Sequence, residues 1–386
     1  MRSFSMHASP FLFDYQPRTR LIFGPDSVEQ VGVLARDFGV GRALLVTDRG
    51  IVAAGHAARV VTFLEAAGLN VALYDAVREN PDTEDVARCV EVARAERVDL
   101  FVGLGGGSSM DTAKGCNFIL TNGGEMRDYW GVGKAGKPML PLIAIPTTAG
   151  TGSECQSAAL IADAVTHQKM ACLDPKAAAR IAILDPLLTL SQPPRVTAVT
   201  GVDALAHALE TAVSRKRTAL SSMWSREAFR LCFSALRRVL EVPGDVEARG
   251  QMLLGAAFAG TAIENSMLGA AHSAANPLTA HHAVVHGQAV GLMLPGVMRF
   301  NGRDAGATVA YEELAGAVGL ASLEALVGAV EELLTIAGLR QRLSDVGVVP
   351  DTIPALAKEA SQQWTAQFNP RAIGPLDFER LYEEAI

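Results

Sequence analysis

Hydrophobic and polar positions alternate in two different ways along the chain. Between about residues 20 and 190, short apolar runs alternate with segments whose apolar residues recur at helical spacing. This order favours a mainly parallel sheet with helices on both faces, since strands covered on both sides are almost wholly apolar. Residues 157–163 and 168–174 predict a hairpin inserted before the last strand. The expected strands of the main sheet lie in 43–48, 70–77, 99–107, 141–148 and 180–186.

The second half of the chain has a helical pattern throughout. The proline-containing segment 190–195 ends the strand signals. Beyond it, apolar residues recur at helical spacing, as in 222–242 and 323–338. We therefore expect an α/β domain over residues 1–190 and an all-helical domain over residues 191–386, with a ligand site in the cleft between them.

A glycine-rich turn follows one of the expected strands. Gly105, Gly106 and Gly107 precede a helical segment that opens at Ser108. Glycines let the backbone approach a bulky ligand, and a helix N-terminus favours a phosphate. Ser108 and Asp111 have the spacing of a capping box, which would start the helix there. The turn favours dinucleotide binding, but it lacks the full G-x-G-x-x-G pattern, and a purely structural tight turn would use the same glycines.

Two further strand ends carry polar residues that suit a nucleotide. Asp48 ends an apolar strand, where a carboxylate accepts hydrogen bonds from a ribose and repels a 2′-phosphate. It favours NAD over NADP, and a solvated loop aspartate is the alternative. The segment 146–154 contains Thr147, Thr148 and Thr151 among glycines. These hydroxyl residues suit a nucleotide or its ribose, and a polar loop that caps the sheet is the alternative.

Histidines are concentrated in one window of the helical half. Upstream of this window, Asp203 and His207 are spaced i, i+4, which places both side chains on one face of a helix. A carboxylate and neutral imidazoles suit a first-row metal such as iron or zinc. A lone Asp–His pair on a helix is commonly a surface contact, so it is the combination that favours a metal site. The four histidines of the window are His272, His281, His282 and His286.

Composition and charge exclude several classes of partner. The chain is 49% hydrophobic and 19% charged with a net charge of −7, so it lacks the basic excess that nucleic-acid binding requires. Its five cysteines are widely spaced and form no C-x-x-C pair, which favours a reduced, cytoplasmic compartment. We expect no signal peptide and no membrane span, because no apolar run is long enough for either.

Taken together, these motifs resemble those of the iron-containing (group III) alcohol dehydrogenase family. The matching motifs, from about residue 15 to the end, are GGGSSMDTAK, IPTTAGTGSE, GVDALAHALE and the histidine block that ends in VVHGQAVGLMLPGVMRFN. The resemblance implies a Rossmann-like dinucleotide-binding domain followed by a metal-binding helical domain. It also implies an NAD-linked oxidoreductase with Fe²⁺, or Zn²⁺ on the same ligands, that acts on a small alcohol or aldehyde and forms a dimer or larger homo-oligomer.

The resemblance further implies roles for residues at matching positions. Asp48 lies where the family selects between NAD and NADP, and an aspartate resembles the NAD-preferring members. Asp111 lies near the nicotinamide end of the site. The four expected metal ligands are Asp203, His207, His272 and His286. The expected dinucleotide contacts are Asp48, Asn80, Gly106, Gly107, Ser108, Thr147, Thr148, Thr151 and Lys169.

One position departs from the family pattern. Many members carry a histidine four residues after the third metal ligand, where it is associated with proton relay, and this chain has Asn276 there. An asparagine amide cannot act as a general base near neutral pH. His281 and His282 are nearby candidates for the proton route, with His282 taken as the catalytic candidate. A structural role for either histidine, and proton transfer through solvent, are the alternatives.

Three other functions are alternatives to the oxidoreductase. A dehydroquinate-synthase-like lyase would need clustered basic residues around the metal, and the window 265–290 contains no Lys or Arg. A metal-free maleylacetate-reductase-like enzyme would not need the Asp-His-His-His set. A catalytically silent nucleotide-binding or assembly protein is suggested only by Asn276.

Overall fold

The computed structural model describes residues 13–166 and 168–386, and the chain divides into two compact units. Each unit has its own secondary-structure class. We name the first the sheet unit, made of Pro17–Thr200 and Arg238–Gly260. We name the second the helical unit, which contains Gly201–Arg237 and Thr261–Ile386.

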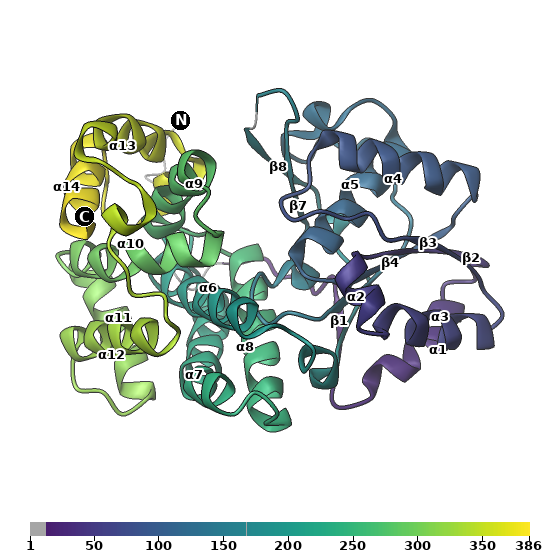
Figure 1. Ribbon diagram of the computed structural model, residues 1–386, viewed down its shortest axis with the longest axis horizontal. Coiled ribbons are helices and arrows are strands. Elements are labelled where there is room, and N and C mark those ends of the chain that lie inside the picture. Colours follow the sequence, from purple (N-terminus) through teal and green to yellow (C-terminus); the bar gives the residue numbers. More distant parts are fainter. Residues whose placement is uncertain (1–12, 167) are drawn as a thin grey trace, which may run out of the picture. The chain divides into compact units, whose positions relative to one another are not determined.

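Six parallel strands form the main sheet of the sheet unit (Figure 1). Their order across the sheet is β1-β9-β6-β4-β2-β3, so the mainly parallel sheet expected from the apolar runs is confirmed. The four-residue strand β1 was not among the predicted strands. The strands are β1 (Arg20–Phe23), β2 (Arg42–Val46), β3 (Asn70–Tyr74), β4 (Leu100–Gly105), β6 (Leu142–Pro146) and β9 (Ile181–Leu184).

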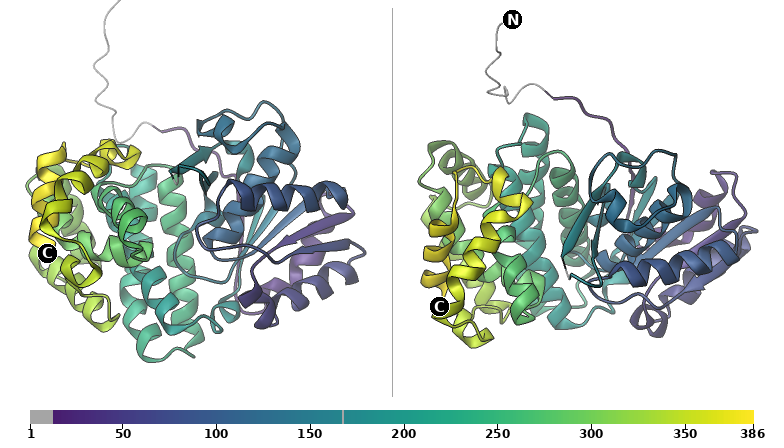
Figure 2. Two further views of the ribbon diagram at one scale, coloured as in Figure 1. Left: turned by 45° about the horizontal axis from the view of Figure 1, so that its top comes forward. Right: turned by 90° about the horizontal axis from the view of Figure 1, so that it is seen from above.

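Both faces of this sheet are apolar because successive side chains of a strand point to opposite sides. In β2, Leu44 and Val46 join one buried cluster, while Ala43 and Leu45 join the other. Other strands and the helices on each face contribute further residues to each cluster (Figures 1 and 2). The first cluster is covered by α4 (Thr83–Ala95) and α5 (Gly107–Asn122), and the second by α1 (Val31–Arg36) and α3 (His56–Ala66), with the short α2 (Arg49–Ala53) before α3.

A smaller sheet accompanies the main one. Strands β7 (Ala158–Ala162) and β8 (Lys169–Leu173) pair antiparallel, which confirms the predicted hairpin. The two-residue strand β5 (Gly131–Val132) adds to β8 in parallel. The backbone N–H of Ala162 donates to Pro81 O at 2.9 Å, so the hairpin contacts the loop between β3 and α4.

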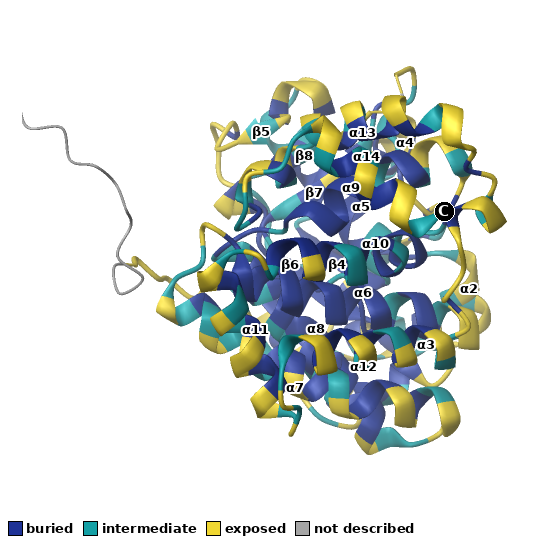
Figure 3. Cartoon of the chain, turned by 90° about the vertical axis from the view of Figure 1, so that its left-hand side faces the viewer, coloured by how far each residue is buried: buried dark blue, intermediate teal, exposed yellow. Residues whose placement is uncertain are grey.

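The second half of the chain is helical as predicted, because the described residues after β9 contain helices and no strand; residues 238–260 of this half belong to the sheet unit. Helix α6 is buried from Gly201 to Val213, and Figure 3 draws it mostly in dark blue. Within the described part of the chain, no helix is long and apolar enough to cross a membrane. The helices are α6 (Pro194–Val213), α7 (Ala219–Glu241), α8 (Val246–Glu264), α9 (Ala270–His282), α10 (His286–Asn301), α11 (Ala305–Ala317), α12 (Leu323–Ile336), α13 (Ile353–Gln362) and α14 (Pro375–Ala385).

Candidate metal centre and dinucleotide site

The glycine-rich turn connects β4 to α5 and is closely packed. Gly105 has φ 142°, a conformation that side chains of L-residues rarely adopt, and a Cβ there would lie 2.5 Å from Ser109 Oγ. A Cβ on Gly107 would lie 2.8 Å from Thr151 Cγ2. The backbone N–H of Thr147 donates to Gly105 O at 2.9 Å. The turn therefore needs glycine for its shape and lies directly against the threonine segment that follows β6.

The turn lies where the strand order of the sheet reverses. Strand β2 has β3 on one side and β4 on the other, so the chain changes direction across the sheet between β2 and β4. Ligands of open parallel sheets bind at the carboxyl ends of the strands at this switch point. Asp48 follows β2, and its Oδ2 would lie 3.6 Å from a Cβ on Gly105. Asp48 Oδ1 accepts from the Ile51 N–H at 3.0 Å, so one carboxylate oxygen caps α2.

The capping box expected at Ser108 and Asp111 is wrong. Helix α5 begins at Gly107, its N-cap is Gly106, and no described side chain caps it. Ser108 therefore lies inside the first turn. Asp111 is buried and accepts a hydrogen bond from Ser153 Oγ at 2.9 Å. No described side chain therefore occupies this helix end, in agreement with a phosphate site, although the N–H groups of Ser109 and Met110 already donate to Gly106 O.

A buried lysine fixes the segment after the threonines, and the sequence analysis did not identify it. Lys114 is fully buried, and its Nζ donates to Ser153 O at 2.6 Å, Gln156 O at 2.8 Å and Ala158 O at 2.9 Å. A charge this deep is tolerated only when it is well hydrogen-bonded. The lysine lies one helical turn after Asp111 in the GGGSSMDTAK motif, and that spacing was a signal for it.

Two carboxyl groups near Lys114 have raised pKa values. Burial raises the pKa of Asp111, and this effect exceeds the opposing attraction of Lys114 and the hydrogen bond from Ser153. Burial likewise raises the pKa of Glu154 to about 7, against opposition from a backbone hydrogen bond and from Lys114. The charge of Lys169, the first residue of β8, also opposes the rise in the pKa of Asp111.

Asn80 lies in the loop between β3 and α4. It is exposed and has φ 52°, an uncommon conformation that asparagine tolerates better than most residues. The loop contacts the β7–β8 hairpin through the bond from Ala162 N–H to Pro81 O, and Lys169 pairs with Ala162 in that hairpin. Asn80 therefore lies in a loop that contacts the hairpin containing Lys169.

Three of the four expected metal ligands form a buried cluster in the helical unit. Asp203 and His207 come from α6, and His272 comes from the first turn of α9. One ligand atom from each lies within 4.8 Å of the others. His286, the first residue of α10, is at the margin of the cluster, with Nε2 4.0 Å from Asp203 Oδ1. The helical spacing of Asp203 and His207 thus points both side chains at the histidine window.

The spacing of the cluster fits a single divalent ion. Asp203 Oδ1 lies 3.5 Å from His207 Nε2 and 3.4 Å from His272 Nε2. Two ligand atoms about 2.1 Å from a tetrahedral ion are about 3.4 Å apart. Among the described residues, neither Asp203 Oδ1 nor His272 Nε2 has a partner in hydrogen-bond geometry, although both atoms are buried. Such atoms are rare in folded proteins, and a shared cation would satisfy both.

The electrostatics of the cluster also favour ligation. Burial alone would raise the pKa of Asp203, but the neighbouring His207, His272 and His286 outweigh it and hold that pKa well below its ordinary value. Burial alone would lower the pKa of His272, but Glu210 and Asp203 outweigh it and raise that pKa to about 9. A cationic group at this position is therefore stabilised by buried carboxylates.

The remaining candidates of the histidine window lie outside the cluster. His281 is exposed, and its Nε2 is 2.6 Å from Glu359 Oε2. His282 is half-buried at the last position of α9. Asn276 Nδ2 donates to Gln363 Oε1 at 3.0 Å.

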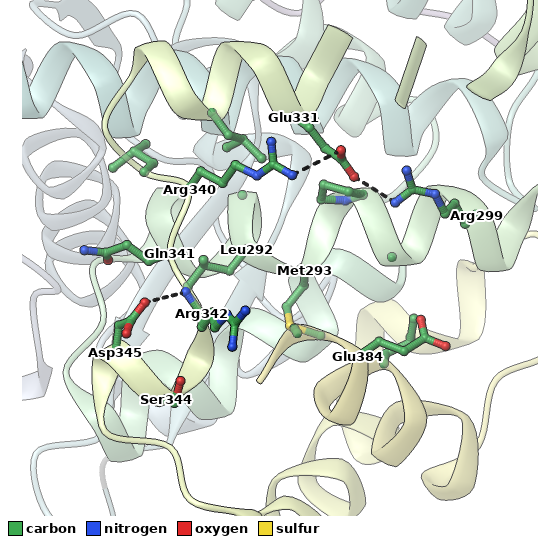
Figure 4. Close-up of a pocket in the computed structure, with 17 residues that line it drawn as sticks. Leu292, Met293, Arg299, Glu331, Arg340, Gln341, Arg342, Ser344, Asp345 and Glu384 are labelled. Atoms are coloured by element: carbon green, nitrogen blue, oxygen red, sulfur yellow. Dashed lines mark hydrogen bonds and ion pairs between the residues drawn. The ribbon is translucent and has the colours of Figure 1, made fainter. Parts of the chain in front are cut away.

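A separate pocket of the helical unit is lined by α10, α12, α14 and the segment after α12 (Figure 4). In it Glu331 lies between two arginines, 2.8 Å from Arg299 Nη1 and 3.5 Å from Arg340 Nη2. The described residues that line this pocket include none of the candidate metal ligands. The ion pairs neutralise much of the arginine charge, so the pocket does not compete with the cluster as a candidate site.

The sheet topology, the glycine-rich turn and the Asp–His cluster are typical of metal-dependent dehydrogenases that bind a dinucleotide. Comparison with known families agrees. Residues 17–186 match the family model described as iron-containing alcohol dehydrogenase, and residues 197–386 match that of the Fe-containing alcohol dehydrogenase family, C-terminal. The chain belongs to the iron-containing alcohol dehydrogenase family.

Named relatives and solved structures cover nearly the whole chain. The NAD-dependent methanol dehydrogenase of Bacillus methanolicus is 33% identical over 95% of this chain and 97% of its own. The lactaldehyde reductase of Escherichia coli K12 is 36% identical over 94% of this chain and 97% of its own. The crystal structure of a 1,3-propanediol oxidoreductase has a TM-score of 0.93 at 31% identity, and covers 97% of this chain and 100% of its own. A sulfoacetaldehyde reductase from Bifidobacterium kashiwanohense, solved in complex with NAD⁺, has a TM-score of 0.89 at 29% identity. The match covers 97% of this chain and 99% of that chain.

Proposed function

We propose that this protein transfers a hydride between NAD(H) and a small alcohol or aldehyde, with one divalent metal ion bound by Asp203, His207, His272 and His286. The observation that carries the proposal is the buried cluster of Asp203, His207 and His272, whose atomic spacing suits one ion. Its relatives include a methanol dehydrogenase and a lactaldehyde reductase, which support a small alcohol or aldehyde as substrate.

The metal is proposed to be Fe²⁺, with Zn²⁺ as the ion that the same ligands also tolerate. When bound, the ion supplies Lewis acidity to the substrate oxygen. Three imidazoles and one carboxylate would hold it, and the burial of Asp203, His207 and His272 would limit the access of water to three of these ligands. The lowered pKa of Asp203 keeps its carboxylate ionised and ready to ligate across the physiological pH range.

The dinucleotide is proposed to bind the sheet unit at the switch point. The turn at Gly106, Gly107 and Ser108 would hold the pyrophosphate with backbone N–H groups. Thr147, Thr148 and Thr151 would line the same turn, which the close approach of Thr148 and Thr151 to its glycines supports. Asn80 and Lys169 would contact the dinucleotide from the side of the β7–β8 hairpin. Residues 1–190 would thus bind the dinucleotide and residues 191–386 the metal.

NAD is proposed as the preferred dinucleotide, because Asp48 follows β2 beside the turn and would repel a 2′-phosphate. Exchange of Asp48 for asparagine removes the negative charge while keeping the size of the side chain. We expect the preference for NAD over NADP, measured as the ratio of kcat/KM values, to fall about tenfold, which corresponds to about 1.4 kcal/mol. An unchanged ratio would show that another residue selects the dinucleotide.

The proton of the reaction is proposed to leave through His282 or through solvent, because Asn276 cannot accept it. His282 lies on the same helix as His272 and is half-buried. Asp111 is proposed to lie beside the nicotinamide, where Ser153 and Lys114 hold its position. A His282→Gln variant whose pH profile matches that of the wild type would exclude His282 from the proton route.

The proposed function is tested with anaerobically purified protein. Its metal content is measured first, and the metal is then removed by chelation. NADH formation is followed with a panel of small alcohols, and NADH consumption with the matching aldehydes, before and after addition of Fe²⁺ or Zn²⁺. The proposal requires turnover that disappears with the metal and returns with it. Equal turnover by stripped and reloaded protein would exclude the metal role.

We further infer a cytoplasmic, homo-oligomeric enzyme, a dimer or larger. The described cysteines are all free and buried, which fits a reducing compartment. The oligomeric state rests on the family pattern, and light scattering of the purified protein tests it.

A further inference from the structure

We propose that Glu210 is a positioning residue of the metal centre, whose carboxylate selects the tautomer of His272 and places that ring against the other ligands. This inference rests on the proposed metal role of His272. Neither the periodicity of the chain nor the family motif assigned a role to Glu210, although it is the last residue of the GVDALAHALE segment.

Both carboxylate oxygens of Glu210 have hydrogen-bond partners at the start of α9. Its Oε2 lies 2.5 Å from His272 Nδ1, and its Oε1 accepts from the backbone N–H of Ala271 at 2.7 Å. A carboxylate accepts hydrogen bonds, so the hydrogen of the neutral His272 ring belongs on Nδ1. Its Nε2 then has a free lone pair, and this atom is the one that lies 3.4 Å from Asp203 Oδ1.

Glu210 lies on the same face of α6 as two of the candidate metal ligands. Asp203, His207 and Glu210 are spaced i, i+4 and i+7, so they share one face of the helix. One helix thereby supplies two candidate ligands and the group that holds a third. Glu210 is 2% exposed, so water does not compete for its oxygens. A rigid, buried acceptor of this kind holds the orientation of a metal-ligating histidine.

Glu210 also fixes the start of α9, two residues before His272. The N-cap of this helix is Gly269, which has no side chain to satisfy the first N–H groups. Glu210 satisfies Ala271, and Asn369 Oδ1 accepts from the N–H of Ala270 at 3.3 Å. A Cβ at Gly269 would lie 3.2 Å from Glu210 Oε1, so the glycine leaves room for the carboxylate.

Glutamine at position 210 separates positioning from simple space filling. Glu210→Gln keeps the size of the side chain but offers one acceptor where two donors converge. If the amide oxygen stays on Ala271, the amide NH₂ donates to His272 Nδ1 and forces the hydrogen onto Nε2, which blocks ligation. If the oxygen turns to His272, two N–H donors face each other at Ala271. Either arrangement weakens metal binding while leaving the ligand set complete.

The test measures metal affinity rather than activity. Metal-stripped, full-length protein is titrated with Zn²⁺ in competition with a chromophoric chelator. We expect Glu210→Gln to bind Zn²⁺ about 10–100-fold more weakly than the wild type, as is usual when a partner of a metal-ligating histidine is lost. Glu210→Asp keeps two acceptors on a shorter stem and should recover part of the affinity. The absorption spectrum of bound Co²⁺ should differ between Glu210→Gln and the wild type, because it reports the arrangement of the ligands.

Asn369→Ala is the matched control. It removes the other side chain that caps α9 but leaves the contact between Glu210 and His272. Its Zn²⁺ affinity should stay close to that of the wild type, even where its melting temperature falls. Equal weakening by Asn369→Ala and Glu210→Gln, or an unchanged affinity in Glu210→Gln, would overturn the proposal.

A measurement on the unaltered protein keeps the test independent of how the variants fold. In the Zn²⁺-loaded wild type labelled with ¹⁵N-histidine, His272 should carry hydrogen on Nδ1 and metal on Nε2. The opposite tautomer would overturn the positioning role while leaving the proposed function intact. A wild type that binds no Zn²⁺ or Co²⁺, or a His272→Ala variant that binds them equally well, would instead overturn the metal role itself.

Discussion

The candidate dinucleotide site and the candidate metal centre are built in opposite ways. The first depends on backbone shape, since the turn from Gly105 to Gly107 leaves no room for side chains and offers N–H groups at the start of α5. The second depends on side chains, since Asp203, His207 and His272 converge from two helices that are far apart in the sequence. A backbone site is local and tolerates few substitutions at its glycines. A side-chain site fails when any one ligand is lost, even if the fold remains.

The largest expected effect comes from removing a metal ligand. His272→Ala should weaken metal binding more than about 100-fold, because losing a ligand costs more than losing the group that orients one. Turnover should fall with it, while NADH binding, measured by fluorescence, should persist. Metal content and kcat/KM are the measurements. His281→Ala is the control, since this exposed histidine pairs with Glu359 outside the cluster. Loss of NADH binding in His272→Ala would contradict the independence of the two sites.

Replacing the buried lysine should come next in size. Lys114→Met keeps the length of the side chain but leaves the carbonyl oxygens of Ser153, Gln156 and Ala158 without this donor. We expect a loss of about 3–5 kcal/mol in the free energy of unfolding, measured with urea, because each buried acceptor left without a donor costs about 1–3 kcal/mol. The exposed Lys137→Met is the control and should cost little. Equal stability of the two variants would show that Lys114 does not hold the segment.

The pH dependence of the metal-free protein tests the charge of the centre. The pKa of His272 is raised from 6.5 to about 9. Its contribution to stability is therefore complete below pH 6.5 and lost as the pH rises toward 9. The loss should be on the order of 3 kcal/mol in urea unfolding. The His272→Ala variant should show a flatter profile, and bound metal should flatten that of the wild type. A stability that rises over this range would contradict the assignment.

The smallest expected effect concerns the turn. A methyl group on Gly107 would meet Thr151, so Gly107→Ala should displace the turn and weaken NADH binding about 10-fold, or about 1.4 kcal/mol. Metal affinity should not change, which sharpens the contrast between the two sites. Gly136→Ala is the control because a Cβ there meets nothing within 4 Å. Fluorescence titration with NADH measures both variants, and equal affinities would remove the turn from the binding site.

Local sequence predicted much of the frame of both sites. Apolar runs predicted the strands because a strand covered on both faces, such as β2 or β4, has apolar side chains on both faces. The spacing of Asp203 and His207 placed them on one helical face, and the glycines marked the turn after β4. The prediction from local sequence was wrong at the start of α5, where Ser108 and Asp111 have a capping-box spacing. Asp111 is instead drawn into the buried contact with Ser153, which local spacing does not encode.

What the sequence by itself determined was therefore the order of the elements, the position of the turn and a family pattern of ligands. It did not determine, from the residues alone, which histidines of the window converge on α6. The tertiary structure brings His272 into the cluster and leaves His281 on the surface, because α9 turns only one side toward its buried neighbours. Only the tertiary structure shows the partners of Lys114 and Glu210. Both are buried charges whose partners come from distant segments, and such partners become visible only when the chain is folded.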